Sequence, residues 1–348
     1  MKKYLLGGKG NFYKANLHCH TNLSDGHLTP AEVKELYKSR GYSVVAFTDH
    51  DALIPHQDLK DADFLPLNGL EISIRNPRPE GVKGKNPVVH MGFIALEEDN
   101  EISPFFHRTK HILHNTEELR RLVKFDESLP DFERDYSVET INAAIAEGKK
   151  RGFYVIYNHP IWSFETEERL RQYKGFDAME VYNNASYILG YEEYTPALQD
   201  TLRRQGMRFA TVAADDNHNK YPAESRRCDA CGGWVQIEAD KLEYRTITKA
   251  LETGSYYAST GPKLHALWVE DGMVHVKCDP ADRILFTLGG GGSKSAVAEG
   301  APLTEASFLL PGHAEWIKIT VYDEKGKFAM TRAYYPEEWL SSGESNPQ

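Results

Sequence analysis

Nine histidine and acidic residues in the first two-thirds of the chain are of the types that bind divalent metal ions. They are His18, His20, Asp25, His50, Glu71, His90, His159, Asp216 and His218. Imidazole nitrogens and carboxylate oxygens suit Zn²⁺, Mn²⁺ and Fe²⁺. Because one such ion takes about four to six ligands, nine candidates predict a cluster of two or three ions.

The spacing of two pairs of candidate ligands suggests that each pair binds the same ion. His18 and His20 are two residues apart, so on a strand both imidazoles point to one side and can reach one ion. Asp216 and His218 repeat that spacing if the strand geometry continues so far. Each of these pairs is therefore predicted to act as a unit.

Residues near the middle of this set have separate predicted roles. Glu71 has an oxygen for each of two metals and could bridge them. Asp49 and Asp51 flank His50, and we expect them to orient imidazoles rather than to bind metal.

The charge of such a cluster favours hydrolysis of anions. Three divalent ions bring six positive charges, and Asp25, Glu71 and Asp216 return three. Lowering the pKa of bound water from 15.7 to about 7 is worth roughly 12 kcal/mol, so hydroxide becomes available without a side-chain nucleophile. We expect attack on phosphorus by a metal-bridging hydroxide. Glu71, Asp216 and His218 are the predicted catalytic residues, and His218 would help the leaving alcohol depart if it is not a ligand.

The elements that must position these residues alternate between strand and helix. Strands are predicted at Ser43–Thr48, Phe64–Leu70, Pro87–Ile94, Phe153–Tyr157, Phe176–Val181 and Arg208–Ala213. Helices are predicted at Ala31–Arg40, Ser137–Arg151 and Thr195–Gln205, with a last one capped by Asp240 and ending near Gly254. Polar ligands at many strand exits favour a parallel (β/α) barrel, since a doubly wound sheet would place them at one switch point.

A second part is predicted after Ser259–Pro262. Short, partly alternating runs at Ala266–Glu270, Val274–Cys278, Ile284–Leu288, Ser307–Leu310 and Trp316–Tyr322 carry no helix pattern between them. They predict a small all-β sandwich. We therefore divide the chain into an α/β hydrolase barrel at 1–262 and a β-sandwich domain at 263–348.

Substrate contacts are expected just past the strand exits, at Trp162, Tyr182 and Asn183, with loop packing as the equal alternative. Arg75 and Arg108 could clamp a second phosphate or carboxylate.

Other titratable residues are given no part in catalysis. His107, His111 and His114 share one helical face by spacing and are expected to form a solvated face. Cys228 and Cys231 form a lone Cys-x-x-Cys pair, which is more typical of incidental thiols than of a structural zinc site.

Composition limits the partners. The 348 residues carry a formal net charge of −10, which disfavours long nucleic acid as a partner. Four cysteines make no disulfide framework, and no apolar run could cross a bilayer or act as a signal peptide. We expect a cytoplasmic protein with a small phosphorylated substrate and no membrane partner, and the sequence is compatible with a homo-oligomer.

Five local motifs together resemble one family. The motifs are His18-Cys19-His20-Thr21, Ser24-Asp25-Gly26, Thr48-Asp49-His50-Asp51, Asn158-His159-Pro160 and Asp216-Asn217-His218. They resemble those of the PHP (polymerase and histidinol phosphatase) family over about residues 10 to 262. The C-terminal β part also resembles a bacterial subgroup of these phosphoesterases.

This resemblance implies a distorted (β/α)7 TIM-like barrel with a trinuclear site holding Mn²⁺, Fe²⁺ or Zn²⁺. By position, the first ion would be held by His18, His20, Glu71 and Asp216, the second by Glu71, His90 and His159, and the third by Asp25, His50 and His218. The implied activity is hydrolysis of a small phosphomonoester or phosphodiester. Two alternatives remain, a metal-dependent amidohydrolase that cleaves C–N bonds and a non-catalytic metal-binding regulatory module.

Overall fold

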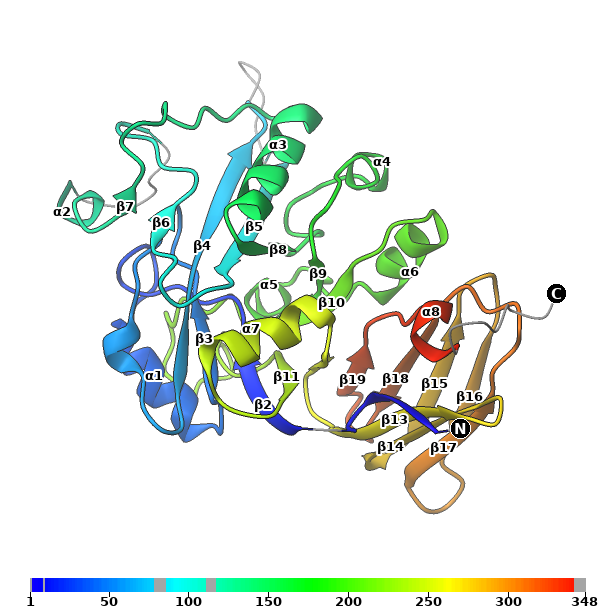
Figure 1. The fold of residues 1–348 in the computed structure, drawn as a ribbon. Coiled ribbons are helices and arrows are strands. Elements are labelled where there is room, and N and C mark those ends of the chain that lie inside the picture. The colour runs from blue at the N-terminus through cyan, green and yellow to red at the C-terminus, as the bar shows by residue number, and fades with distance from the viewer. Residues whose placement is uncertain (1, 9, 78–85, 111–116, 341–348) are drawn as a thin grey trace.

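The computed structural model describes residues 2–8, 10–77, 86–110 and 117–340 (Figure 1). A 13-stranded sheet has the order β10 (Ala210–Ala214), β9 (Ala178–Asn183), β8 (Phe153–Tyr157), β5 (Val88–Ala95), β4 (Leu65–Arg75), β3 (Val44–Phe47), β2 (Asn11–Asn16), β11 (Trp234–Ala239), β12 (Tyr256–Ser259), β19 (Phe328–Thr331), β18 (Ile317–Tyr322), β15 (Arg283–Leu288) and β16 (Ser293–Val297). A 4-stranded sheet has the order β1 (Lys3–Leu6), β13 (Leu264–Glu270), β14 (Met273–Ala281) and β17 (Leu303–Leu309), and β6 (Ile102–Ser103) pairs with β7 (Lys124–Phe125).

The helices are mostly short. They are α1 (Pro30–Ser39), α2 (Glu117–Arg120), α3 (Val138–Lys150), α4 (Glu167–Leu170), α5 (Asn184–Ile188), α6 (Pro196–Arg204), α7 (Tyr244–Thr253) and α8 (Pro336–Trp339), with a 3-10 turn, η1, at Gln57–Leu59. The predicted capping box of α1 is present, since Thr29 and Glu32 exchange hydrogen bonds ahead of Pro30. The N-cap of α7 is Glu243 rather than the expected Asp240, while Gly254 ends that helix at φ 66° as expected.

The mixed α/β architecture predicted from the sequence is confirmed, but a closed barrel is not shown. Strands β2, β3 and β4 are mutually parallel, as are β8, β9 and β10. Strand β5 runs antiparallel to both of its neighbours, β4 and β8. Among the described residues, the sheet stays open, and a single parallel bridge between Cys19 and Asn217 links the segments that follow β2 and β10.

An additional antiparallel β region follows β12, as expected from the change in pattern. It lies to one side of the α/β part, with β1 running beside β13 (Figure 1). Pairing of β12 with β19 makes its strands continuous with the large sheet. Strands β16 and β19 and the short helix α8 were not predicted. A buried apolar core that includes Leu267, Val276, Phe286 and Ile319 fills the space between its two sheets.

A buried ionic cluster links α6 to this β region. Lys318 on β18 places its Nζ 2.6 and 2.7 Å from the two carboxylate oxygens of Asp200. The Arg203 guanidinium lies 3.3 Å from Asp200 and also donates to Gln199 and Thr211. All of these side chains are buried, so the Asp200 carboxylate faces two cations inside the protein with little contact with water.

No helix within the described ranges combines the length and apolar character needed to cross a membrane.

Candidate metal centre

All nine predicted metal-binding side chains converge on one site. Four overlapping groups of ligand atoms, each within 4.8 Å of one another, are formed by His20, Asp25, His50 and His218; by His18, His159 and Asp216; by His18, His20 and Glu71; and by His50, Glu71 and His90. The strands β2, β3, β8 and β10 end close before these residues, while Glu71 and His90 lie within β4 and β5. The set predicted for the third ion, Asp25, His50 and His218, is present as a group, and His20 joins it. His159 groups with His18 and Asp216, and it also lies beside Glu71 and His90, with its Nε2 3.4 Å from Glu71 Oε1 and its ring 5.0 Å from the His90 ring.

Glu71 is the centre of this arrangement and is almost fully buried. Its Oε1 lies 3.2 Å from both His18 Nε2 and His90 Nδ1 and 3.4 Å from His159 Nε2. Its Oε2 lies 3.1 Å from His50 Nδ1. The two oxygens thus face different imidazoles, which is the arrangement that the bridging prediction requires.

The donor set fits divalent cations. Glu71 Oε2 and His90 Nδ1 are buried and face ligand-type atoms at 3.1 and 3.2 Å without well-aligned hydrogen bonds in the described part of the chain. The Nε2 atoms of His18 and His20 point at one another at 3.1 Å, and each lies 3.1 Å from Asp216 Oδ1. Converging lone pairs are costly to bury unless a proton or a cation lies between them, and one bound cation satisfies several of them at once.

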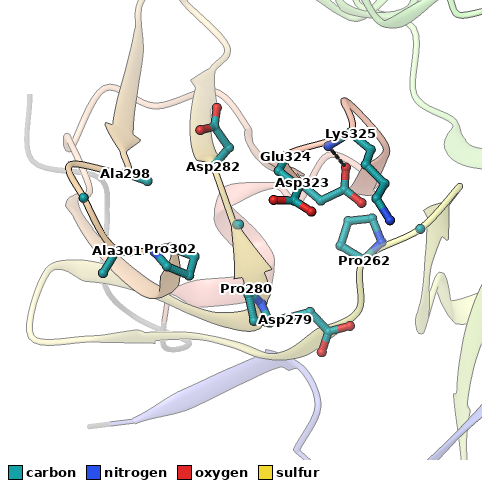
Figure 2. A pocket seen from close by; sticks show the side chains of 13 residues that line it. Pro262, Asp279, Pro280, Asp282, Ala298, Ala301, Pro302, Asp323, Glu324 and Lys325 are labelled. Carbon is teal, nitrogen blue, oxygen red and sulfur yellow. Dashed lines mark hydrogen bonds between the residues drawn. The ribbon is translucent and has the colours of Figure 1, made fainter.

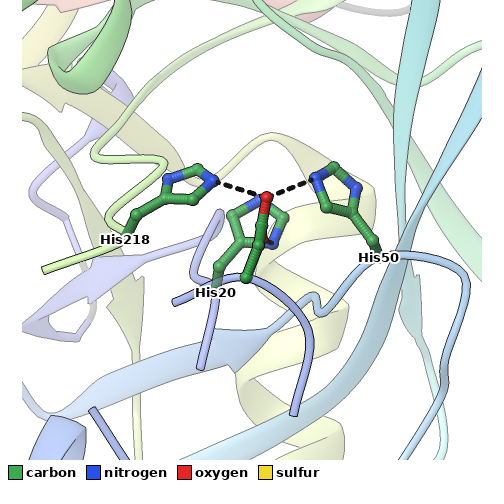
Figure 3. A group of neighbouring side chains, drawn as sticks. His20, His50 and His218 are labelled. Atoms are coloured by element: carbon green, nitrogen blue, oxygen red, sulfur yellow. Dashed lines mark ion pairs between the residues drawn. The ribbon is translucent and has the colours of Figure 1, made fainter. Parts of the chain in front are cut away.

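A second, more accessible group surrounds Asp25. Its Oδ2 lies 3.5 Å from His50 Nε2 and 3.4 Å from His218 Nε2, with His20 beneath (Figure 3). The His218 side chain is 30 % exposed and that of Asp25 26 %, whereas the other ligand candidates are nearly closed to solvent. His218 Nδ1 donates to the backbone oxygen of Asp216 at 2.9 Å, which leaves Nε2 free to bind a metal ion or a proton.

The carboxylates of the cluster favour protonation of some of the histidines that would bind metal ions. Burial lowers the pKa of His18, but the carboxylates of Asp216, Glu71 and Glu180 outweigh it and raise the pKa well above its usual value. His218 behaves similarly: against burial, Asp25 and Asp216 raise its pKa to about 9. For His90, burial prevails and lowers the pKa to about 3. Protons and metal ions therefore compete for His18 and His218.

Glu180 on β9 is a site residue that the sequence did not reveal. Its Oε1 accepts a hydrogen bond from His18 Nδ1 at 2.8 Å, and its Oε2 accepts from the backbone N of His159 and from Asn183 Nδ2. This contact fixes the His18 tautomer with the Nε2 lone pair toward Glu71. A carboxylate in an otherwise apolar buried strand was the available indication.

Substitution of Glu180 by glutamine is expected to weaken metal binding by about 10- to 100-fold without removing a metal ligand. Glutamine can still accept from His18 but loses the negative charge that makes the imidazole a stronger donor to metal. Competition with a chromophoric chelator measures the affinity. Glu165→Gln, a buried carboxylate paired with Arg169 away from the cluster, is the control. Equal affinities in wild type and Glu180→Gln would contradict the assigned role.

Asp49 reaches an imidazole through Ser24, whose Oγ lies 2.6 Å from Asp49 Oδ1 and 3.5 Å from His20 Nδ1, and the ion pair of Asp51 is formed with Arg134 and not with an imidazole. Asp49 accepts from the backbone N and hydroxyl of Thr21 and from Ser24, so it holds the turn that carries Asp25. Asp51 has a positive φ of 57° and lies 2.5 Å from the Arg134 guanidinium. These carboxylates therefore shape the backbone around the cluster.

Glu193 holds the segment after His159. Its carboxylate accepts from the backbone N atoms of Ile161 at 3.0 Å and Trp162 at 2.7 Å. Burial raises its pKa to about 7. Because the folded protein keeps this proton at a pH where the unfolded chain has lost it, stability is full below about pH 4.5 and falls as the pH rises toward 7.

Relative to Glu193→Gln, the wild-type free energy of unfolding is expected to fall by about 1–3 kcal/mol between pH 5 and pH 8. Urea denaturation of both proteins at the two pH values measures this difference. The exposed neighbour Glu192, changed to glutamine, is the matched control. A pH-independent difference between wild type and Glu193→Gln would show that Glu193 is ionised throughout.

A cavity of about 520 Å³ opens above the metal centre. Of the predicted substrate contacts, Arg75 and Trp162 line it, and Tyr182 and Asn183 do not. Asn183 is buried and donates to Asp216 Oδ2 at 3.2 Å, so it supports a ligand instead. Arg108 lies elsewhere, paired with Asp131.

The remaining titratable candidates lie away from the centre. The expected solvated face is wrong for His107, which is buried with Nε2 3.1 Å from Glu133. His111 and His114 lie outside the described residues. Cys228 and Cys231 are free thiols.

A second hollow, of about 690 Å³, lies in the β region, and its charged lining is mainly acidic. Asp279, Asp282, Asp323 and Glu324 surround it (Figure 2). Lys325 also lines this hollow, and its backbone N donates to Asp323. A concave surface rich in carboxylates repels anions.

Comparisons with known proteins agree with the family motifs. Residues 16–183 match the family model of the PHP domain. The chain has no significant match among curated proteins. A two-domain protein of Bacteroides vulgatus, containing a predicted PHP-like metal-dependent phosphoesterase, is 13% identical at TM-score 0.45, covering 96% of this chain and 90% of the other.

Two further solved structures resemble parts of the chain. A candidate metal-dependent phosphoesterase of Bifidobacterium adolescentis is 18% identical at TM-score 0.41, covering 62% of this chain and 92% of that one. An amidohydrolase of Chromobacterium violaceum with bound sulfate and no metal is 17% identical at TM-score 0.39, covering 59% and 87%.

Proposed function

Residues 16–183 of this chain belong to the PHP domain family, and from this premise we propose that the protein is a metal-dependent phosphoesterase that hydrolyses a small phosphate ester. The observation that carries the proposal is the position of Glu71, whose two oxygens face different imidazoles in a set of nine ligand-type side chains, seven of them buried. Such a set suits two or three Mn²⁺, Zn²⁺ or Fe²⁺ ions.

The residues that would hold these ions are the nine of the cluster. When bound, the ions supply a water of lowered pKa and positive charge for the phosphoryl oxygens. The chain itself contributes geometry and proton positions. Glu180 directs His18 Nε2 toward Glu71, and Ser73 holds His90 Nε2 at 2.7 Å so that Nδ1 faces the same carboxylate.

We assign His218 to protonation or charge neutralisation of the leaving group. Its Nδ1 is committed to the Asp216 carbonyl, and its Nε2 lies beside Asp25 at the accessible side of the centre. A proton on Nε2 can pass to a departing alkoxide, whereas a metal on Nε2 would neutralise it instead. Both roles require contact with the leaving group, and this histidine is the most exposed of the six in the cluster.

A small substrate is favoured over a polymer. The cavity of about 520 Å³ has room for a small molecule, and the chain's formal charge of −10 repels a polyanion. We also propose a cytoplasmic location and treat 263–348 as a β-sandwich unit that packs beside the catalytic part.

The test combines metal analysis with turnover on one preparation. Metal ions are removed from the purified protein with a chelator, and the protein is reloaded with Mn²⁺, Zn²⁺ or Fe²⁺. Turnover is then assayed on phenyl phosphate, diphenyl phosphate and an aryl amide. Two or three ions per chain with ester turnover support the proposal and identify the ester class. Amide turnover alone would replace it with an amidohydrolase, and bound metal with no turnover on any substrate would favour a regulatory module.

A further inference from the structure

The cavity above the metal centre has two zones. Its floor consists of the candidate ligands, including Glu71, His90 and His159. Its outer part is lined by His27, Arg75, Trp162, Ala185, Ser186, Ile188, Leu189, Lys220, Tyr221, Arg227 and Asp229. A phosphoryl group at the metal ions would occupy the floor, so the outer zone must contact the rest of the substrate.

Three cations line this outer zone, in a chain of strong net negative charge. Arg75, Lys220 and Arg227 are exposed, and none forms an ion pair with a carboxylate in the described part of the chain. The carboxylate of Asp229, which also lines the cavity, already accepts from the backbone N atoms of His218 and Asn219 at 2.9 and 3.0 Å. The outer zone is therefore predominantly positive.

The cations come from two separate segments and lie beyond the floor. On β4, Glu71, Ser73 and Arg75 share one face because side chains alternate along a strand, so this face leads from the metal centre to the mouth. Arg75 is about 13 Å further along the strand than Glu71. Lys220 and Arg227 follow His218 on another segment, and the Arg227 guanidinium lies 4.2 Å above the Tyr221 ring.

Between floor and mouth, the wall is apolar and aromatic. The Trp162 ring is 4.7 Å from the His159 ring and 5.0 Å from the His90 ring. Ile188 and Leu189, with Leu189 68% exposed, also line the cavity. A substrate that spans this zone gains from a flat or apolar body beside Trp162.

We propose that the substrate is a phosphate ester whose leaving alcohol carries a second anionic group, a carboxylate or a phosphate, bound by Lys220, Arg227 and Arg75. This inference rests on the proposed phosphoesterase function and adds the chemistry of the leaving group. The metal centre takes the phosphoryl group that is cleaved, the apolar wall takes the body of the alcohol, and the cations at the mouth take the second anion.

Turnover of three matched esters tests the proposal. Phenyl phosphate has no second anion, 4-carboxyphenyl phosphate has a carboxylate, and 1,4-phenylene bisphosphate has a phosphate. In the Lys220→Gln and Arg227→Gln variants, kcat/KM for the two esters with a second anion is expected to fall about tenfold or more relative to kcat/KM for phenyl phosphate. Each variant is compared with wild type, so differences in leaving-group reactivity cancel. Lys150→Gln on α3, whose side chain is 80% exposed, is the control.

Binding to metal-free protein provides an independent readout. Calorimetry on metal-free protein compares wild type with a variant that differs only at the mouth, so the floor contributes equally to both and the difference reports the mouth. Wild type is expected to bind 1,4-phenylene bisphosphate at least tenfold more tightly than does the triple variant Arg75→Gln, Lys220→Gln, Arg227→Gln. Equal binding together with an unchanged substrate ratio would overturn the second-anion site while leaving the phosphoesterase intact. Failure of all three esters with bound metal, but retained binding at the mouth, would instead overturn the phosphoesterase.

Discussion

Replacement of Glu71 by glutamine is expected to lower phosphoesterase turnover by about a thousandfold or more and to remove at least one bound ion per chain. Glutamine matches glutamate in shape but exchanges one ligand oxygen for an NH₂ group. Since Oε1 and Oε2 face different imidazoles, either orientation of the amide points a donor at a place where a cation would sit. The negative charge that balances the ions is lost as well.

Elemental analysis and steady-state kinetics on the same sample measure both effects. Glu165→Gln neutralises another buried carboxylate and should keep wild-type metal content and turnover, which separates the site effect from a general cost of burial. Circular dichroism establishes that Glu71→Gln is folded. Full turnover with full metal content in that variant would exclude Glu71 as a bridge.

Replacement of Asp200 by alanine is expected to cost about 3–5 kcal/mol of unfolding free energy, far from the metal centre. The change leaves the Lys318 ammonium buried without its partner and beside the Arg203 guanidinium. Burial already lowers the Lys318 pKa to about 8, and Asp200 opposes that effect. Urea denaturation measures the loss as a shift of the transition midpoint.

An exposed carboxylate with two lysine partners offers the contrast. Asp61 lies 2.8 Å from Lys34 and 2.7 Å from Lys38, and its side chain is 35% exposed. Asp61→Ala should cost less than about 1 kcal/mol, because water replaces the lost pairs. Similar costs for Asp61→Ala and Asp200→Ala would show that the buried cluster has no special role in joining α6 to the β region.

The gathering of the metal-binding side chains could be anticipated because it depends on local features. A histidine or aspartate directly after a buried run, as at His50 and His159, lies where parallel strands end together. Helix boundaries were equally local, as Thr29, Glu32 and Gly254 show.

Features set by contacts between distant segments were missed. Glu180 gains its role from His18, 162 residues away, and its place in a buried strand could have marked it as unusual but not named that partner. Arg134 reaches Asp51 from a loop of irregular structure. The direction of β5 is decided by its pairing with both neighbours, and a buried run of this kind is apolar in either direction.

The bridge between Cys19 and Asn217 has a consequence for the order of events during synthesis. His18 and His20 leave the ribosome about 200 residues before Asp216 and His218, which at usual translation rates is about 10–40 s. In that interval, the nascent chain presents an incomplete set of histidines. Ions captured then are held by fewer ligands and exchange readily, so we expect the metal that the finished protein retains to be selected only after residue 218 has emerged.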